Sequence, residues 1–375
     1  MHGNRIRKAV RTAGTILLIP ALLAGLQRLL MPKYMSDVLE GGMIEEYYAQ
    51  DKDHDVIFFG DCEVYTNFSP AVLWQEYGIN SYIRGSAEQL IWQSYYLMEE
   101  TFTYEKPKVA VFNVLAMMFN EPQKESYNRM TLDGMRWSLS KIKSIQVSMT
   151  EEEHFIEYVF PLLRYHSRWN QLQEEDFRYF RGKDPVTFNG YYMRVDVLPA
   201  ENVPEGRPLA DYRFGEQAYA YLDRMVELCE QNDVELVLVK ATSLYPYWYE
   251  EWEEQIVAYA EEHQLKYYNF LDVTEEIGLD YGEDTYDAGL HLNLSGAEKL
   301  SRYFGRILVE DWGLEDRRDE QELTIQWQEK LEAYQKEQQR QLNQYEMTLS
   351  GAGADGADAE QIAASGTRYR LRYLE

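Results

Sequence analysis

The sequence predicts an α/β fold, a three-layer α/β/α sandwich with a parallel sheet, and three observations lead to this class. Short apolar runs rich in Val, Ile and Phe alternate with longer helical patterns along residues 55–312. The runs are apolar throughout, as in strands that are buried on both faces. Polar residues follow directly after several runs, at the edge where open parallel sheets bind their ligands.

The predicted elements alternate in the way that a parallel sheet with crossover helices requires. Strands are expected at residues 56–59, 81–84, 109–112, 235–239 and 266–270. Helices are expected at residues 70–77, 89–102, 216–232, 249–264 and 295–312. The α/β domain is therefore assigned to residues 55–312.

Residues 120–214 interrupt this alternation and are predicted to form a helical insertion. Because the insertion follows the carboxyl end of a strand, it is expected to cover the ligand-binding edge. Its most polar and aromatic cluster is a candidate substrate-binding patch, formed by Arg164, His166, Arg168 and Trp169. The alternative is a helix end at which cations interact with the macrodipole.

Residues 1–31 are predicted to form an N-terminal signal anchor, a transmembrane helix, and residues 32–54 a linker with a short helix. Four basic residues precede a nearly continuous apolar stretch at residues 13–26. Positive charge before such a stretch keeps the N-terminus in the cytoplasm. A cleaved signal peptide is the alternative. Either interpretation places the globular part outside the cytoplasm, and the anchor makes the chain a single-pass protein of the cell membrane.

The C-terminal region changes in character after the α/β domain. Residues 313–349 are predicted to form an amphipathic surface helix, with Leu323, Trp327, Leu331 and Tyr334 at helical spacing. Residues 350–375 are predicted to be a flexible tail whose last residues alternate like an edge strand.

Composition excludes some classes of function. The net charge of −27 argues against nucleic-acid binding, which needs clustered Lys and Arg. The 31 tyrosines suit stacking on sugars, although ordinary packing explains them equally well. No ligand spacing for zinc, no phosphate loop and no dinucleotide fingerprint is present, so no cofactor or metal is predicted.

The most informative stretch is Gly60-Asp61-Cys62, which ends the first predicted strand. A cysteine at this position can act as a nucleophile at the edge of the sheet. Far along the chain, Asp287 and His291 lie just before the last predicted helix and can supply an orienting carboxylate and a general base. The alternatives are a buried structural cysteine and an ordinary core or surface histidine. Cys229, on the apolar face of a predicted helix, is expected to be an inert core thiol.

These two segments resemble the SGNH/GDSL hydrolase superfamily, whose first block reads Gly-Asp-Ser and whose last block carries Asp and His. Cys62 would replace the nucleophilic serine. Asp287 stands four residues before His291 instead of the common three. This longer spacing resembles the envelope-anchored branch that includes DltD and the alginate acetylation proteins. The resemblance implies an oxyanion hole formed by the backbone of Cys62 and Gly85 and by the side-chain amide of Asn113.

The resemblance implies an esterase or an acyltransferase that acts on ester-linked acyl groups of a cell-envelope glycan, through Cys62, His291 and Asp287. It also implies membrane attachment through the N-terminal helix and a membrane acyltransferase as a candidate partner. The alternative is a catalytically inactive relative that binds a surface polysaccharide or an envelope-assembly partner. Close approach of the Cys62 sulfur to a His291 nitrogen is expected if the site is active.

Overall fold

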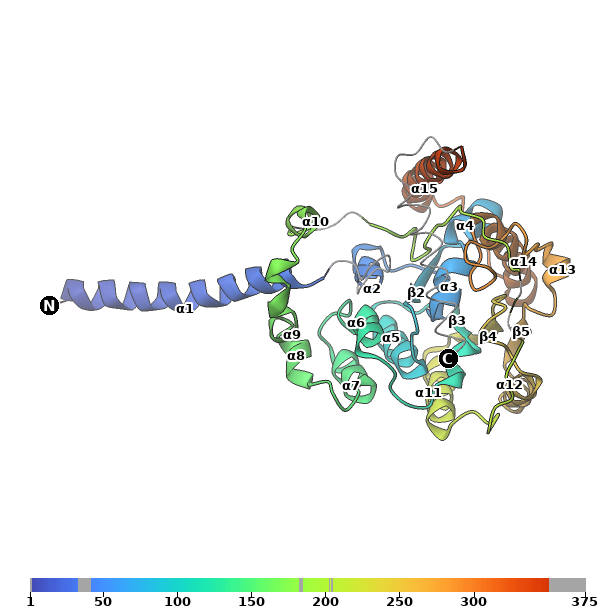
Figure 1. Ribbon diagram of the computed structural model, residues 1–375, viewed down its shortest axis with the longest axis horizontal. Helices are drawn as coiled ribbons and strands as arrows, with labels where there is room; N and C mark the ends of the chain where they lie inside the picture. The colour runs from blue at the N-terminus through green and yellow to red at the C-terminus, as the bar shows by residue number, and fades with distance from the viewer. Residues whose placement is uncertain (1, 33–41, 182–184, 202, 204, 351–375) are drawn as a thin grey trace.

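The computed structural model describes residues 2–32, 42–181, 185–201, 203 and 205–350. Five strands form one parallel sheet in the order β2-β1-β3-β4-β5 (Figure 1). Their bounds are Val56–Gly60 for β1, Ser81–Gly85 for β2, Val109–Asn113 for β3, Glu235–Lys240 for β4 and Lys266–Asn269 for β5. All five predicted strands are confirmed. The strand order reverses between β1 and β3, and ligand sites of open parallel sheets lie at such a switch point.

The sheet is buried on both faces because successive side chains alternate between two hydrophobic cores. Ile57 and Phe59 of β1 enter one core, with Ala110 of β3. Val56 and Phe58 enter the other core. This explains why the strands are apolar throughout instead of alternating apolar and polar residues.

Helices cover both faces, which confirms the three-layer α/β/α class. One layer contains α5 (Ile91–Tyr104), α11 (Glu216–Asn232) and α12 (Glu250–Glu262). The opposite layer contains α3 (Cys62–Asn67), α4 (Pro70–Tyr77) and α14 (Leu294–Trp312), with the short α13 (Thr274–Ile277) beside it. The five predicted helices all form, two of them with the predicted bounds. The six-residue helix α3 was not predicted.

The predicted insertion is helical only in its first part. It contains α6 (Glu125–Leu132), α7 (Leu139–Ser148), α8 (Phe155–Val159), α9 (Leu162–Tyr165), η3 (His166–Asn170) and α10 (Glu174–Arg178), after η2 (Val114–Met118). Helix α7 packs on α5, and α9, η3 and α10 contact the N-terminal helix (Figure 1). An extended stretch, residues 185–201, then returns to the sheet.

The N-terminal segment forms the long helix α1 (His2–Leu30), which projects away from the α/β domain (Figure 1). Within the part of the chain that the structure describes, no helix combines the length and the apolar character that crossing a membrane requires.

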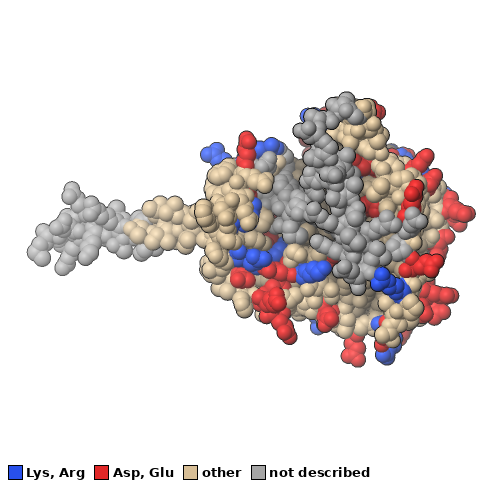
Figure 2. Space-filling view, in the orientation of Figure 1, with Lys and Arg blue, Asp and Glu red and all other residues tan. Residues whose placement is uncertain are grey.

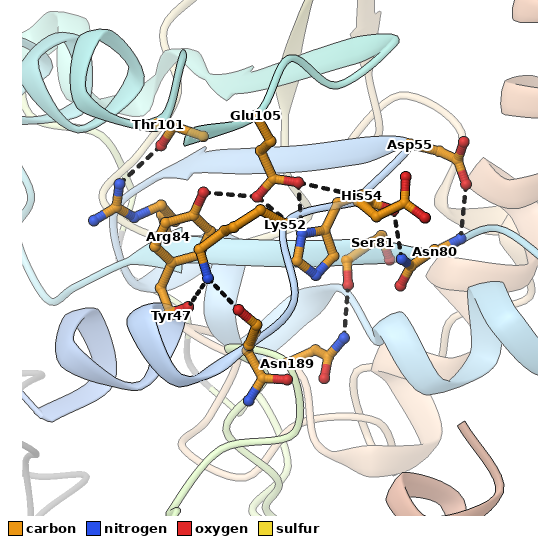
Figure 3. Close-up of polar contacts among 12 residues, drawn as sticks. Tyr47, Lys52, His54, Asp55, Asn80, Ser81, Arg84, Thr101, Glu105 and Asn189 are labelled. Carbon is orange, nitrogen blue, oxygen red and sulfur yellow. Dashed lines mark hydrogen bonds and ion pairs between the residues drawn. The ribbon is translucent and has the colours of Figure 1, made fainter. Parts of the chain in front are cut away.

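The segment before β1 is fixed to the sheet by a buried polar cluster (Figure 3). It carries α2 (Gly42–Glu46) and η1 (Tyr47–Ala49), which confirms a short helix in the predicted linker. The carboxylate of Glu105 accepts hydrogen bonds from the Tyr47 hydroxyl at 2.6 Å and from the His54 backbone at 2.8 Å. His54 Nδ1 lies 3.0 Å from the same carboxylate. The residues just before β1 are therefore an integral part of the fold.

The predicted amphipathic C-terminal helix is present as α15 (Gln321–Leu349). The ring of Trp327 stacks on Trp74 of α4 with the centroids 5.3 Å apart, and its Nε1–H donates to Asn80. Leu323, Trp327 and Tyr334 are buried, as their spacing predicted. Residues 351–375, with the predicted terminal strand, lie outside the described residues.

Candidate active site

Cys62 lies at the turn that joins β1 to α3, at the carboxyl edge of the sheet. Asp61 caps α3, since its side chain accepts a hydrogen bond from the backbone N–H of Glu63 at 3.1 Å. Cys62 is the first residue of the helix, and it is buried. The helix predicted at residues 70–77 is present as α4, but the structure places the unpredicted helix α3 before it. The strand-to-helix turn is sharper, so the cysteine is set directly at a helix start.

His291 is oriented by Asp287 through two hydrogen bonds. One carboxylate oxygen accepts from the His291 backbone N–H at 2.8 Å, and the other lies 2.6 Å from Nδ1. An ionised carboxylate can only accept, so Nδ1 carries the proton and Nε2 is left as the basic nitrogen. The Tyr245 hydroxyl donates to the backbone carbonyl oxygen of Asp287 at 2.5 Å, which stabilises the position of this residue.

The four-residue spacing between Asp287 and His291 has a conformational cause. Ala288 and Gly289 both have positive φ, of 66° and 99°. Two consecutive residues of this kind curl the chain back, so one carboxylate reaches both the backbone and the ring of His291. Glycine adopts positive φ without strain, whereas an alanine there is held by its surroundings. Asn293 then caps α14, because its side chain accepts from Gly296 at 3.2 Å.

The loop that carries Asp287 and His291 is attached to the helix that begins with Cys62. The Asn67 side chain, at the end of α3, accepts from the Leu292 backbone at 3.0 Å. The Tyr286 ring stacks on the His291 ring with the centroids 5.6 Å apart. The structure therefore brings the predicted nucleophile, base and orienting residue to the same edge of the sheet.

The predicted oxyanion donor Gly85 also lies at this turn. Gly85 pairs with Gly60 across β2 and β1. A Cβ atom on Gly85 would lie 2.6 Å from Val64 and 3.2 Å from the Asp61 carbonyl oxygen. Only glycine allows the chain this close to the turn that presents Cys62. The backbone of residue 85 is therefore beside the candidate nucleophile, as the oxyanion prediction requires.

Asn113, the other predicted donor, is engaged elsewhere. Its amide nitrogen donates to Asp61 at 3.1 Å and to Glu63 at 2.8 Å, and its oxygen accepts from the Ala241 backbone at 3.2 Å. An amide NH₂ has two hydrogens, and both are used here. Asn113 lies at the predicted place, at the end of β3, but in this structure its amide binds carboxylates instead of lining an oxyanion hole.

A fully buried ion pair lies directly behind the turn, and the sequence analysis did not assign it a role. Lys240 Nζ lies 2.9 Å from one Glu63 carboxylate oxygen and 3.2 Å from the other. It also donates to the Ala241 carbonyl at 2.7 Å. Two sequence features could have suggested this ion pair, a lysine at the end of an apolar strand and a glutamate next to Cys62. The pairing across 177 residues could not be inferred from either residue alone.

Burial and nearby charge keep the Cys62 thiol protonated. Burial raises its pKa well above the ordinary value, and the charges of Asp61, Glu63, Glu88 and Asp287 raise it further. Burial and the Glu63 charge also raise the pKa of Asp61, to about 7. Burial, together with the negative charge of these groups, therefore outweighs any stabilisation of a thiolate by the helix start. A base that removes the proton during the reaction, such as His291, is required for nucleophilic attack.

The extended part of the insertion approaches this site. The Tyr192 N–H donates to the Tyr65 carbonyl at 2.8 Å, and the Leu294 N–H donates to the Arg194 carbonyl at 2.7 Å. The Arg194 guanidinium lies over the Tyr286 ring, 4.9 Å from its centroid. The insertion thus contacts the site through residues 192–198, and the sequence analysis did not single out this stretch.

The predicted substrate-binding cluster lies in a different place. Arg168 donates to the Leu30 carbonyl at the end of α1 at 2.6 Å, and it pairs with Asp176. Arg164 pairs with Glu125 of α6 at 2.7 Å. The cluster with His166 and Trp169 therefore sits beside α1. The expectation that it overhangs the sheet edge is corrected, because α9 and η3 turn toward the N-terminal helix.

Neither a disulfide between the two cysteines nor a metal-binding group is present among the described residues. Both cysteines are free and buried in different cores, Cys229 next to Met98 at 3.7 Å between the sulfurs. In the described part of the chain, no three His, Cys, Asp or Glu residues are grouped so that they could hold a metal ion.

Known proteins resemble this chain in fold but not in sequence. No protein-family model and no curated protein matches the chain. Its fold is similar to that of a protein from Bacteroides fragilis NCTC 9343 that is provisionally described as an acylhydrolase. That match has 11% identity and a TM-score of 0.35, and covers 71% of this chain and 94% of the other.

The fold is also similar to that of a GDSL-like lipase from Bacteroides thetaiotaomicron VPI-5482. The identity is 12% and the TM-score 0.33, and the match covers 72% of this chain and all of the other. Both similarities concern the fold alone.

Proposed function

We propose that the protein is an SGNH-like esterase or acyltransferase in which Cys62, His291 and Asp287 act on an acyl ester. The observation that carries the proposal is the buried Asp287–His291 pair, with Nδ1 and the carboxylate 2.6 Å apart, on a loop that is bonded to α3. A carboxylate-oriented histidine beside a cysteine at a strand-to-helix turn is an arrangement that supports acyl transfer.

The reaction would run in two stages. His291 Nε2 takes the proton of the Cys62 thiol as the sulfur attacks the ester carbonyl carbon. The tetrahedral intermediate collapses, the carbon–oxygen bond breaks, and His291 returns the proton to the leaving alcohol. A thioester on Cys62 remains. Water or a sugar hydroxyl then gives its proton to His291 and attacks the thioester, and Cys62 leaves as the thiol.

The negative charge that develops on the carbonyl oxygen would be held by the backbone N–H groups of Cys62 and Gly85. Preorganised donors of this kind are typically worth about 3–4 kcal/mol each in the transition state. For Asn113 to add a third hydrogen bond, it would have to release Asp61 or Glu63. Its contribution would therefore depend on a rearrangement of these carboxylates.

The acyl groups of a cell-envelope glycan are the proposed substrate, and a single-pass membrane location with an extracytoplasmic domain is the proposed setting. The basic residues before the apolar part of α1 support this orientation. A membrane acyltransferase is the proposed donor partner. No cofactor is needed for this chemistry, since side chains supply the nucleophile and the base, and backbone N–H groups supply the oxyanion donors.

A second candidate function, binding of a glycan or partner without turnover, is favoured by one specific observation. Asp61 and Glu63 occupy both hydrogens of the Asn113 amide and, with burial, keep the Cys62 thiol protonated. An inactive relative would show these features.

Trapping of an acyl-enzyme separates the two candidates. The full chain is incubated with a small activated ester, and the mass of the intact protein and of its peptides is measured. The proposal predicts one acyl group on Cys62 and none in Cys62→Ala. Cys229→Ala is the matched control, because that thiol is also buried and should leave the adduct unchanged. Absence of any adduct on Cys62 would favour the binding protein.

A further inference from the structure

An exposed apolar surface surrounds the place where α1 leaves the α/β domain. Six large apolar residues of the 156–180 stretch are exposed: Ile156, Phe160, Leu163, Trp169, Phe177 and Phe180. We call these six residues the apolar collar. Trp169 exposes 71% of its surface and Phe177 60%, so they are not parts of a core. Soluble proteins rarely gather aromatic and aliphatic side chains in this way without a binding partner.

The collar is continuous with α1. Helices α9 and α10 and the turn η3 contact α1 (Figure 1). The Arg168 guanidinium donates a hydrogen bond to the carbonyl oxygen of Leu30, at the C-terminal end of α1. A Cβ atom on Gly25 of α1 would lie 3.9 Å from the Phe180 ring, so the two segments are close there as well. On α1 itself, five leucines are exposed as well, Leu17, Leu18, Leu22, Leu23 and Leu26, whereas Leu30 at its end is buried. Two segments that are far apart in sequence therefore form one apolar surface at one end of the molecule.

The charge around this surface differs from the charge of the rest of the chain. The chain carries a net charge of −27, yet residues 2–30 contain five basic residues and no acidic one. Arg164, His166 and Arg168 lie in the middle of the 156–180 stretch, where residues 158–173 contain no acidic residue, and the four acidic residues of the stretch lie at positions 157 and 174–176. Arg164 pairs with Glu125 and Arg168 pairs with Asp176. Figure 2 shows acidic side chains gathered mainly on the part of the domain that is far from α1.

We infer that the apolar collar docks on a lipid bilayer, with Trp169 and the phenylalanines at the level of the headgroups and the α1 leucines deeper. Aromatic side chains favour this interfacial zone. Arg164 and Arg168 are paired with Glu125 and Asp176, so the five basic residues of α1 supply the attraction to anionic lipids. The acidic remainder of the domain is repelled by anionic lipids, which fixes one orientation. This inference rests on the proposed membrane location and deepens it, and it holds whether or not Cys62 is reactive.

The docking has a consequence for the position of the site. The collar and the α1 end would rest on the lipid, and the rigid α/β domain would hold the Cys62–His291 edge at one fixed height and angle above it. The insertion that separates β3 from α11 would then orient the domain and, through residues 192–198, contact the site at its other end.

A spin-label accessibility measurement on the full chain tests this inference. A nitroxide is attached at Leu163→Cys and, in a second protein, at Phe177→Cys. The matched control is Ile325→Cys on α15, because Ile325 is exposed to 50% and Leu163 to 52%, and Ile325 lies away from the collar. The unsubstituted chain gives the background from the two buried cysteines. Vesicles of equimolar phosphatidylcholine and phosphatidylglycerol are then added.

The expected result is that oxygen accessibility rises and nickel accessibility falls at positions 163 and 177 when vesicles are present, with no change at position 325. In the unlabelled chain, amide exchange in residues 155–178 should slow on vesicle addition. Labels at 163 and 177 that stay as accessible to nickel as the label at 325 would overturn the inference. So would protection that appears without vesicles and grows with protein concentration, because the collar would then bind a second copy.

Discussion

Among the residues that the structure describes, two buried histidine–carboxylate pairs are alike in their bonding and differ in their place in the fold. His54 and His291 each give a backbone N–H and a ring Nδ1 to a single carboxylate, Glu105 and Asp287 respectively. His54 precedes β1, at the amino edge of the sheet (Figure 3). His291 lies at the carboxyl edge, on the loop beside Cys62 and α3.

The surroundings of the two pairs decide what each can do. Glu105 also accepts from the Tyr47 hydroxyl, and the His54 ring lies beside the rings of Tyr47 and Tyr82, whose centroids are 6.5 and 5.4 Å away. No described nucleophile faces it. The Asp287–His291 pair has the Cys62 thiol nearby, and Gly85 allows its strand to approach the turn that carries this thiol. The pair at the carboxyl edge is therefore the candidate for chemistry, because open parallel sheets bind their ligands at that edge.

The largest expected effect concerns the charges that distinguish the carboxyl edge. Lys240→Met leaves the Glu63 carboxylate buried without its cation, and removal of one partner of a buried pair typically costs about 3–5 kcal/mol. Denaturant unfolding should show this loss. The double variant Glu63→Gln, Lys240→Met removes both charges and should recover most of it. If Lys240→Met unfolds at the wild-type midpoint, the ion pair does not hold the turn together.

A smaller loss of stability is expected at the amino edge. His54→Ala takes one hydrogen-bond partner from Glu105, which keeps the Tyr47 hydroxyl and the backbone N–H of residue 54. The cost should be about 1–3 kcal/mol, the usual penalty for a buried polar group that loses a partner. Thermal unfolding measures it, with His166→Ala as the exposed control. An equal or larger loss in the control would show that the His54 ring contributes nothing specific.

The smallest expected effect is a difference in acid sensitivity. Burial raises the pKa of Glu105, but hydrogen bonds from His54 and Tyr47 and the His54 charge lower it more, so the net pKa is below the ordinary 4.5. Its contribution to stability is therefore complete above the unfolded pKa and is lost as the pH falls through the folded pKa. As the pH falls below about 4.5, the wild type should therefore lose stability more steeply than Glu105→Gln. Parallel curves for the two proteins would contradict this.

Sequence alone predicted the sheet, the helices on its two faces and the place of Cys62, Asp287 and His291, because apolar runs and helical periods are local signals. It missed α3, since six residues with a valine and a threonine carry too little periodicity. It also missed the Glu63–Lys240 pair and the engagement of Asn113, which depend on which strands become neighbours. The Arg164–Trp169 cluster was noticed, but only the packing of α9 and η3 against α1 gave its place.

The rate at which an activated ester acylates Cys62, compared among the wild type, His291→Ala and His54→Ala, tests the central claim most directly. The three proteins receive the same ester, and the acyl adduct on Cys62 is followed by intact-mass spectrometry. His291→Ala should be slower by at least about a hundredfold, the scale of a general base. His54→Ala should acylate at the wild-type rate while folded, because its pair lies at the other edge of the sheet. Equal rates in the wild type and His291→Ala would contradict the account.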